Sequence, residues 1–306
     1  MKTMSEFNRF TEMAMRKFQR GRITSKLIAV KANGFVIFKT MLTVLVFLIG
    51  ADVDAQTTDN APINHEIGLK IDKPVKVLYL GDSLTDYDRG SNHVDKLQAK
   101  IEKIAPGMVK FYNYSVRGDF ITRVLARFNR VKGVYGPERF DGIWDCQYDW
   151  AFVFLGHNDT RASSETDFQK PLVEVEKIAV SYGKLISILR SKGIKRIILV
   201  SPSSSNFELT SSKAEKIVAA IKAGKAGKRK HTVRFGDPKH MEAFRDIVRN
   251  FAFQNGCEFF DIYDDMKVLP NKAELFRSTD GVHLTQKGHE YIADRTYNYL
   301  LENGTK

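Results

Sequence analysis

Three side chains in the sequence have the types that nucleophilic hydrolysis needs: Ser83, Asp280 and His283. A serine hydroxyl attacks a carbonyl effectively only when a neighbouring base accepts its proton. A histidine can accept that proton and then return it to the leaving group. Asp280 precedes His283 by three residues, so its carboxylate can orient the imidazole within a tight turn. These residues predict acyl transfer if the fold brings Ser83 to His283.

The same reaction needs hydrogen-bond donors for the negative oxygen that forms on the attacked carbonyl. The candidates are the backbone N–H groups of Ser83 and Gly118 and the side-chain amide of Asn158. Gly118 has no side chain, so its backbone can approach a substrate closely. Taken singly, each of these residues is equally well explained as a turn or capping residue. Their combination favours a catalytic site.

Apolar runs separated by segments of helical periodicity predict the elements that position these residues. Continuous apolar runs are typical of strands buried on both faces, and alternation with helices predicts a parallel sheet covered on both sides. We expect one such α/β domain over residues 74–303. The expected strands are 75–80, 109–114, 150–155, 197–201 and 258–262, and the expected helices are 92–104, 119–128, 168–191, 238–255 and 285–301.

The candidate catalytic residues share one edge of this expected sheet. Ser83, Gly118 and Asn158 follow the first three expected strands. The carboxyl ends of parallel strands meet at one edge, where open α/β sheets build their sites. Asp280 and His283 precede the last helix, and we expect them at the same edge.

Four short blocks that contain these residues make the chain resemble the SGNH hydrolases, also called the GDSL esterase/lipase superfamily. The blocks are GDSLT with Ser83, NYSVRGD with Gly118, GHND with Asn158, and DGVH with Asp280 and His283. They follow the family's order, and the resemblance covers about residues 75–300. It implies a flavodoxin-like three-layer α/β/α fold with about five parallel strands. It also implies an esterase with Ser83 as nucleophile, His283 as base and then acid, and Asp280 as the orienting carboxylate.

The resemblance further implies an oxyanion hole made by Ser83, Gly118 and Asn158, with no cofactor and no metal. One departure from the family pattern is Ser115, where many members carry glycine; we expect it to be tolerated because this position is not an oxyanion donor. Neither a Cys-x-x-Cys nor a His-Glu-x-x-His motif occurs in the sequence, so no motif supports a metal site.

Other functions leave part of the constellation unexplained. A phosphate-binding turn after the first strand gives no role to Asn158, Asp280 or His283. The Gly-x-Ser-x-Gly elbow of conventional α/β-hydrolases is not present around Ser83. The non-enzymatic alternative is an envelope binding module on a degenerate hydrolase fold. That alternative predicts missing catalytic residues, and none is missing.

The substrate is less constrained than the chemistry. We expect removal of small acyl groups, such as acetyl, from carbohydrate, and the alternative is a lipid-directed esterase, either a lysophospholipase or a thioesterase. A long connection over residues 129–149 and the segment after the fourth strand carry aromatic residues that either stack on sugar, line an acyl pocket or belong to the core. These residues are Tyr135, Phe140, Trp144, Tyr148 and Phe207.

The positive charge of the chain, +12 in total, is concentrated at its N-terminus. Residues 1–40 hold nine Lys or Arg and two Glu, and an apolar run over 41–50 and small residues up to Ala55 follow. This is the pattern of a signal peptide, and the run is shorter than the roughly 20 residues of a spanning helix. We expect cleavage after Ala55, a linker over 56–73 and a periplasmic or secreted domain. The alternative is an uncleaved membrane anchor with the domain outside the cytoplasm.

A second basic stretch lies inside the expected domain, where seven Lys and Arg fall between Lys213 and Lys230. Charge runs are commonly solvated faces, so we favour a solvated helix and loop over a binding site for a polyanion. We expect no nucleic-acid partner, because more than half of the excess charge belongs to the N-terminal arm. The two cysteines, Cys146 and Cys257, are too few for a disulfide framework, and we expect them to be unpaired.

Overall fold

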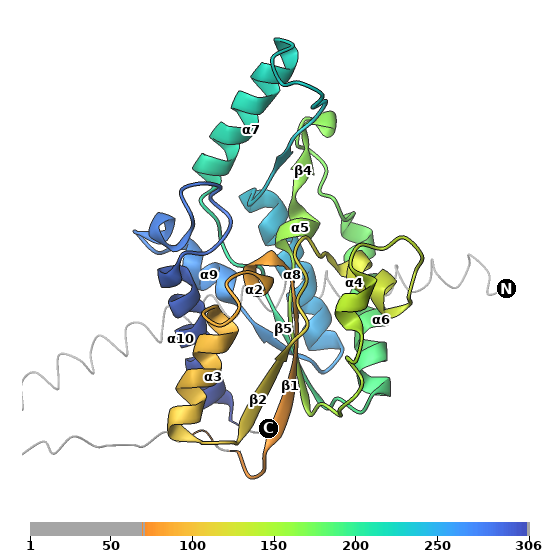
Figure 1. Cartoon of the computed structure of the whole chain (residues 1–306), viewed down its shortest axis with the longest axis vertical. Helices are drawn as coiled ribbons and strands as arrows, with labels where there is room; N and C mark the ends of the chain where they lie inside the picture. Colours follow the sequence, from red (N-terminus) through yellow and green to blue (C-terminus); the bar gives the residue numbers. More distant parts are fainter. Residues whose placement is uncertain (1–68, 70, 305–306) are drawn as a thin grey trace, which may run out of the picture. The chain divides into compact units, whose positions relative to one another are not determined.

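The structure, a computed structural model, describes residue 69 and residues 71–304 (Figure 1). The predicted basic arm and signal peptide, and most of the predicted linker, lie outside the described residues. Among the helices that the structure describes, none is long and apolar enough to cross a membrane.

A five-stranded parallel sheet forms the centre of the domain, in the order β2-β1-β3-β5-β7. Every residue of the strands formed by the apolar runs at 150–154 and 196–200 is buried, as expected for strands covered on both faces. All five predicted strands are therefore present. Their bounds are β1 (Val75–Gly81), β2 (Val109–Asn113), β3 (Trp150–Phe154), β5 (Arg196–Val200) and β7 (Glu258–Phe260).

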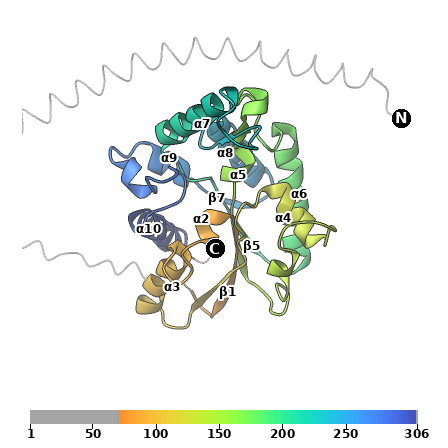
Figure 2. The ribbon, with the colours of Figure 1, turned by 45° about the horizontal axis from the view of Figure 1, so that its top comes forward.

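Helices cover both faces of the sheet and complete a three-layer α/β/α fold (Figure 2). One layer contains α3 (His93–Ile104), α9 (Ile262–Lys267) and α10 (Gln286–Asn303). The other contains α4 (Ile121–Phe128), α6 (Val175–Ser191) and α8 (Pro238–Gln254).

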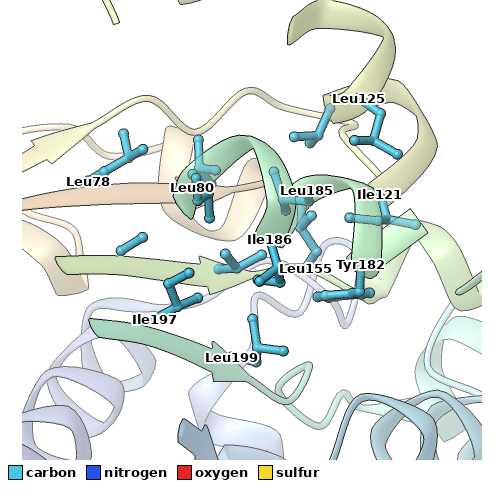
Figure 3. Close-up of a cluster of buried hydrophobic side chains, with 14 of the residues drawn as sticks. Leu78, Leu80, Ile121, Leu125, Leu155, Tyr182, Leu185, Ile186, Ile197 and Leu199 are labelled. Carbon is cyan, nitrogen blue, oxygen red and sulfur yellow. The ribbon is translucent and has the colours of Figure 1, made fainter. Parts of the chain in front are cut away.

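Alternate side chains of the strands feed the two cores. On the face covered by α4 and α6, Leu78 and Leu80 of β1 pack with Leu185 and Ile186 of α6 (Figure 3). On the other face, Tyr79 lies in the core that α3 and α10 close. Burial of such side chains contributes about 1.5–3 kcal/mol each, so the two cores fix the strand ends from which the site is built.

The predicted helix 168–191 begins later, at Val175. Asp167 and Phe168 have positive φ angles, 50° and 57°, which a right-handed helix cannot contain. Phe168 packs instead in a small separate cluster with Ala162 and Ala214. Its apolar character therefore reflects that cluster and not the face of the long helix.

Several short elements escape the sequence patterns because they are too brief to show periodicity. Two of them, four residues each, follow β1 and β3 and carry candidate site residues. A longer helix, α7, contains the start of the basic stretch, for which a solvated helix and loop was expected, although no bounds were predicted for it. The additional elements are α2 (Ser83–Asp86), α5 (His157–Thr160), α7 (Phe207–Lys222), the antiparallel pair β4 (Ala162–Ser163) and β6 (Val233–Arg234), and the 3₁₀ turns η1 (Pro137–Phe140), η2 (Ser164–Thr166) and η3 (Lys272–Leu275).

Candidate active site

The turn from β1 into α2 presents Ser83 at the carboxyl edge of the sheet. Asp82 caps the short helix, and its Oδ1 accepts the Leu84 N–H at 3.0 Å. A side chain at Gly81 has no room, since a Cβ there would lie 2.8 Å from the Thr85 hydroxyl. The glycine and the capping aspartate thus fix where the Ser83 hydroxyl stands.

Ser83, His283 and Asp280 form a continuous hydrogen-bonded chain. The Ser83 Oγ lies 3.0 Å from His283 Nε2, and His283 Nδ1 lies 3.0 Å from Asp280 Oδ2. An ionised carboxylate can only accept a hydrogen bond, so His283 Nδ1 must carry the imidazole proton and donate it to Asp280. His283 Nε2 is then free to accept a hydrogen bond from the Ser83 hydroxyl. The structure therefore joins three residues that lie up to 200 positions apart in the sequence.

Asp280 is held as a carboxylate by its own turn. Its Oδ1 accepts the backbone N–H groups of Val282 and His283, each at 2.8 Å. Burial alone would raise the pKa of Asp280, but the two amides and the His283 imidazole outweigh it and hold that pKa below its ordinary value. The charge that orients the imidazole is therefore present at neutral pH.

Ser83 and Gly118 line the cleft, and their backbone N–H groups have no hydrogen-bond partner among the described residues. Gly118 has a φ of 76°, a conformation that glycine adopts at little cost. Asn158 lines the same cleft. Its amide donates to Asp82 Oδ2 at 3.3 Å, which leaves its second N–H available. The residues that carry the three donors expected from the sequence thus line one cleft.

Two arginines that were not predicted from the sequence bind the oxygen atoms of Gly118 and Asn158. Arg123 Nη1 donates to the Gly118 carbonyl at 2.9 Å, and Arg161 Nη1 donates to Asn158 Oδ1 at 3.2 Å. A cation on the amide oxygen fixes which end of the Asn158 side chain faces the cleft. Burial, together with the nearby Arg123 charge, lowers the pKa of Arg161. The spacing of Arg161, three residues after Asn158, is the only local sequence signal of this contact.

Buried ionisable groups lie beneath the site. Burial raises the pKa of Asp82 to about 7, and the neighbouring Asp159 and Asp119 act in the same direction. Burial likewise lowers the pKa of His157 to about 3, with His283 adding to the effect. His157 is therefore neutral at working pH, and its Nε2 lies 2.8 Å from the Ser203 hydroxyl. It lines the cleft as a neutral ring.

The cleft above Ser83 has a volume of about 640 Å³. Of the aromatic residues singled out in the sequence, Tyr135 lines it, whereas Phe140 and Tyr148 are buried in the core. Tyr87, which no sequence pattern marks, lies with its ring centroid 4.8 Å from that of His283. The wall also carries three cations, Arg117, Arg123 and Lys213.

Other predicted features can be placed as well. Cys146 and Cys257 are free thiols, as expected. Ser115 is buried and does not line the cleft. Within residues 69 and 71–304, no group of His, Cys, Asp or Glu side chains is arranged to hold a metal ion.

The chain was compared with known proteins. The model of the GDSL-like Lipase/Acylhydrolase family matches residues 79–291, a range that contains all five candidate site residues. A comparison with curated proteins finds no match.

Solved structures share the fold at low sequence identity. An acetyl xylan esterase, AlAXEase, is 19% identical with a TM-score of 0.52, covering 74% of this chain and 99% of that one. A catalytic mutant of Axe2, an acetylxylan esterase from Geobacillus stearothermophilus, is 18% identical with a TM-score of 0.53, covering 76% and 96%. A lipase/acylhydrolase from Enterococcus faecalis is 17% identical with a TM-score of 0.51, covering 75% and 96%.

Proposed function

Since the chain belongs to the GDSL-like Lipase/Acylhydrolase family, a family of ester hydrolases, we propose that Ser83 is its nucleophile and that it removes small acyl groups, such as acetyl, from carbohydrate. The observation that carries the catalytic assignment is the chain of two 3.0 Å contacts from Ser83 through His283 to Asp280. It lies in a cleft beside two unpartnered backbone N–H groups.

In the first half of the reaction, the Ser83 Oγ forms a bond to the ester carbonyl carbon while its proton passes to His283 Nε2. The carbonyl oxygen becomes negative and accepts hydrogen bonds from the N–H groups of Ser83, Gly118 and Asn158. The carbon–oxygen bond to the alcohol then breaks, and His283 gives its proton to the departing alcohol oxygen. The product of this half is an acyl ester on Ser83.

In the second half, water attacks the acyl carbonyl and His283 accepts a proton from that water. The same three N–H donors hold the second oxyanion. The bond to Ser83 Oγ breaks, the proton returns from His283 to that oxygen, and the carboxylic acid leaves. Asp280 stabilises the protonated imidazole in both halves without taking its proton.

Two considerations support a small acyl group on carbohydrate. Two of the similar structures are of acetylxylan esterases. In addition, the cleft combines the rings of Tyr87 and Tyr135 with charged groups, a mixture that suits a polar sugar. The alternative, a lipid ester, is an outcome of the experiment below.

We further propose that the domain acts after export. The support is the sequence of residues 1–55, with its basic region, short apolar run and small residues before the expected cleavage point. Exported hydrolases meet acylated glycans, which is consistent with the proposed substrate.

The test uses the purified chain with p-nitrophenyl acetate, p-nitrophenyl octanoate, acetylated xylooligosaccharide and a long-chain lysophospholipid. We expect hydrolysis of both acetyl substrates in preference to the long chains. A fluorophosphonate probe should label Ser83, and Ser83→Ala should lose both labelling and turnover, by on the order of 10⁴–10⁶-fold in kcat. Ser191→Ala, at the exposed end of α6, is the matched control. Undiminished turnover in Ser83→Ala refutes the nucleophile, and preference for the lysophospholipid refutes the substrate class.

A further inference from the structure

The helix α7 and the loop after it carry an excess of positive charge past the carboxyl edge of the sheet. Figure 1 shows α7 extending beyond α2 and α5, which lie at that edge. Residues 207–231 hold only two acidic side chains, Glu208 and Glu215, and none of their seven cations pairs with a described carboxylate. These cations are Lys213, Lys216, Lys222, Lys225, Lys228, Arg229 and Lys230.

The first of these cations enters the candidate active site. Lys213 lines the cleft together with Ser83 and His283, and its ammonium donates to the carbonyl of Thr279. A lysine ammonium has three N–H donors, so two remain for a ligand. Thr210 and Ile217 line the same cleft, and this spacing places them with Lys213 on one face of α7. The helix therefore joins the cleft to the basic loop at its far end.

Two further cations, Arg117 and Arg123, line the cleft. Arg117 donates to the Tyr135 hydroxyl at 3.0 Å, and Arg123 donates to the Gly118 carbonyl; neither pairs with a described carboxylate. Among the described residues, Asp280 is the one acidic side chain that lines the cleft, and its oxygens are taken by His283 and two backbone amides. A neutral sugar would leave these cations without an anionic partner.

The position of Lys213 indicates which part of the ester is charged. His283 must give its proton to the departing alcohol, so the alcohol lies on the His283 side of the cleft. Lys213 binds the carbonyl of Thr279, the neighbour of Asp280 in the turn that carries His283. An anion held by Lys213 is therefore part of the alcohol, which is the sugar, and not part of the acyl group.

We propose that the substrate is an acyl ester of an acidic glycan, such as a polymer of uronate units, whose carboxylates bind Lys213 in the cleft and the cations of residues 222–230 beyond it. This inference rests on the proposed function and adds the charge of the polymer. A membrane surface is disfavoured as the partner, because helices that bind membrane interfaces bury an apolar face. Apart from Lys213, the five lysines and the arginine of this stretch are solvent-exposed, and no large apolar side chain at 222–231 is exposed with them.

The first experiment compares an acetylated oligogalacturonate with an acetylated xylooligosaccharide of equal length. We expect a higher kcat/KM for the acidic substrate at low salt and a steep fall with added salt, because charge attraction is screened. Lys213→Gln should lower the acidic-to-neutral ratio of kcat/KM about tenfold, the loss of one hydrogen bond to a charged group. Lys184→Gln, an exposed lysine on α6, should leave the ratio at the wild-type value.

A binding measurement separates this inference from the proposed function. Calorimetry of Ser83→Ala with unacetylated oligogalacturonate should show salt-sensitive binding that weakens in the double variant Lys225→Gln/Lys228→Gln. Binding of the oligouronate without any ester hydrolysis would refute the proposed function and keep the acidic ligand. Hydrolysis with equal or greater preference for the neutral oligosaccharide, or binding only to anionic lipid vesicles, would overturn the inference.

Discussion

Two series of hydrogen-bonded side chains, each with a hydroxyl, imidazole and carboxylate group, start from the same short helix, α2, at positions two residues apart; we refer to each as a hydrogen-bonded chain. The first runs from Ser83 through His283 to Asp280. The second starts at Thr85, whose Oγ1 lies 3.3 Å from His93 Nε2, and continues from His93 to His289 and then to an aspartate. Both chains contain the side-chain types of a catalytic triad.

The surroundings separate the two chains. Ser83 and His283 line the cleft next to unpartnered N–H donors. Thr85, His93 and His289 are no more than 1% exposed, so no substrate reaches them. Composition and hydrogen bonding are therefore not enough for catalysis; solvent access and oxyanion donors decide which chain can react.

The buried chain supports the exposed one. His289 Nε2 lies 3.2 Å from Asp88 Oδ2, and that carboxylate also pairs with the guanidinium of Arg277. The backbone of Arg277 donates to the carbonyl of His283 at 2.7 Å and accepts from Gly281 at 2.8 Å. The second chain thus ends on the residue that holds the His283 turn, which gives it a structural role.

The largest contrast should come from neutralising the last carboxylate of each chain. Asp280→Asn is expected to lower kcat by about 10⁴-fold, because an amide favours the wrong imidazole tautomer and cannot stabilise its charge. Asp88→Asn should keep most of the activity and lower the free energy of unfolding by about 1 kcal/mol or less, as for a partly exposed ion pair. Asp88 has a φ of 52°, which asparagine also adopts readily. Steady-state kinetics and urea unfolding of both variants measure the contrast, and equal losses of kcat would contradict it.

A smaller contrast should come from the amides beside each chain. Asn158→Ala removes a proposed oxyanion donor and should lower kcat by about 10²–10³-fold with little change in KM. Asn113 is the matched control, because its side chain bonds to the Thr85 carbonyl and the Ser115 N–H at 3.0 Å each. Asn113→Ala should lower the free energy of unfolding and change kcat less than Asn158→Ala does. A larger kcat loss in Asn113→Ala than in Asn158→Ala would show that the donors are wrongly assigned.

The exposed chain could be predicted from the sequence, and the buried one could not. The apolar runs that became β1 and β3 place Ser83 and Asn158 at one sheet edge, and the Asp280–His283 spacing is local. No comparable pattern marks the second chain, since His93 and His289 are 196 residues apart and meet only when α3 packs on α10.

The same reasoning applies to the supporting contacts of the active site. Arg123 and Arg161 bind acceptors that only the folded turns present. The true start of α6 at Val175 depends on left-handed backbone at Asp167 and Phe168, which apolar periodicity does not reveal. Sequence patterns therefore identify the candidate catalytic groups more readily than the residues that position them.

The smallest expected effect concerns the free energy of unfolding at acidic pH, to which the histidines of the buried chain should contribute more than His283 does. Burial lowers the pKa of His289, and Arg277 and Lys96 add to this, whereas Asp88 acts in the opposite direction without reversing it. Burial and the charge of His289 lower the pKa of His93 well below its ordinary value. Both histidines are therefore neutral in the folded protein at pH values where the unfolded chain protonates them.

His289→Asn should make stability less sensitive to acid. Below the ordinary histidine pKa of about 6.5, the unfolded chain binds more protons than the folded one. The free energy of unfolding therefore decreases as the pH is lowered, by up to about 1.4 kcal/mol per pH unit for each such histidine. In the wild type, the backbone N–H of His93 donates to His289 Nδ1 at 3.3 Å, and the asparagine side chain still offers an oxygen to accept it. Asparagine does not titrate, so the variant loses one of the protons that the unfolded chain binds in excess of the folded one. Urea unfolding between about pH 5 and pH 7 should give a shallower slope for this variant than for wild type. A slope equal to that of wild type in His289→Asn would mean that His289 does not stay neutral in the fold.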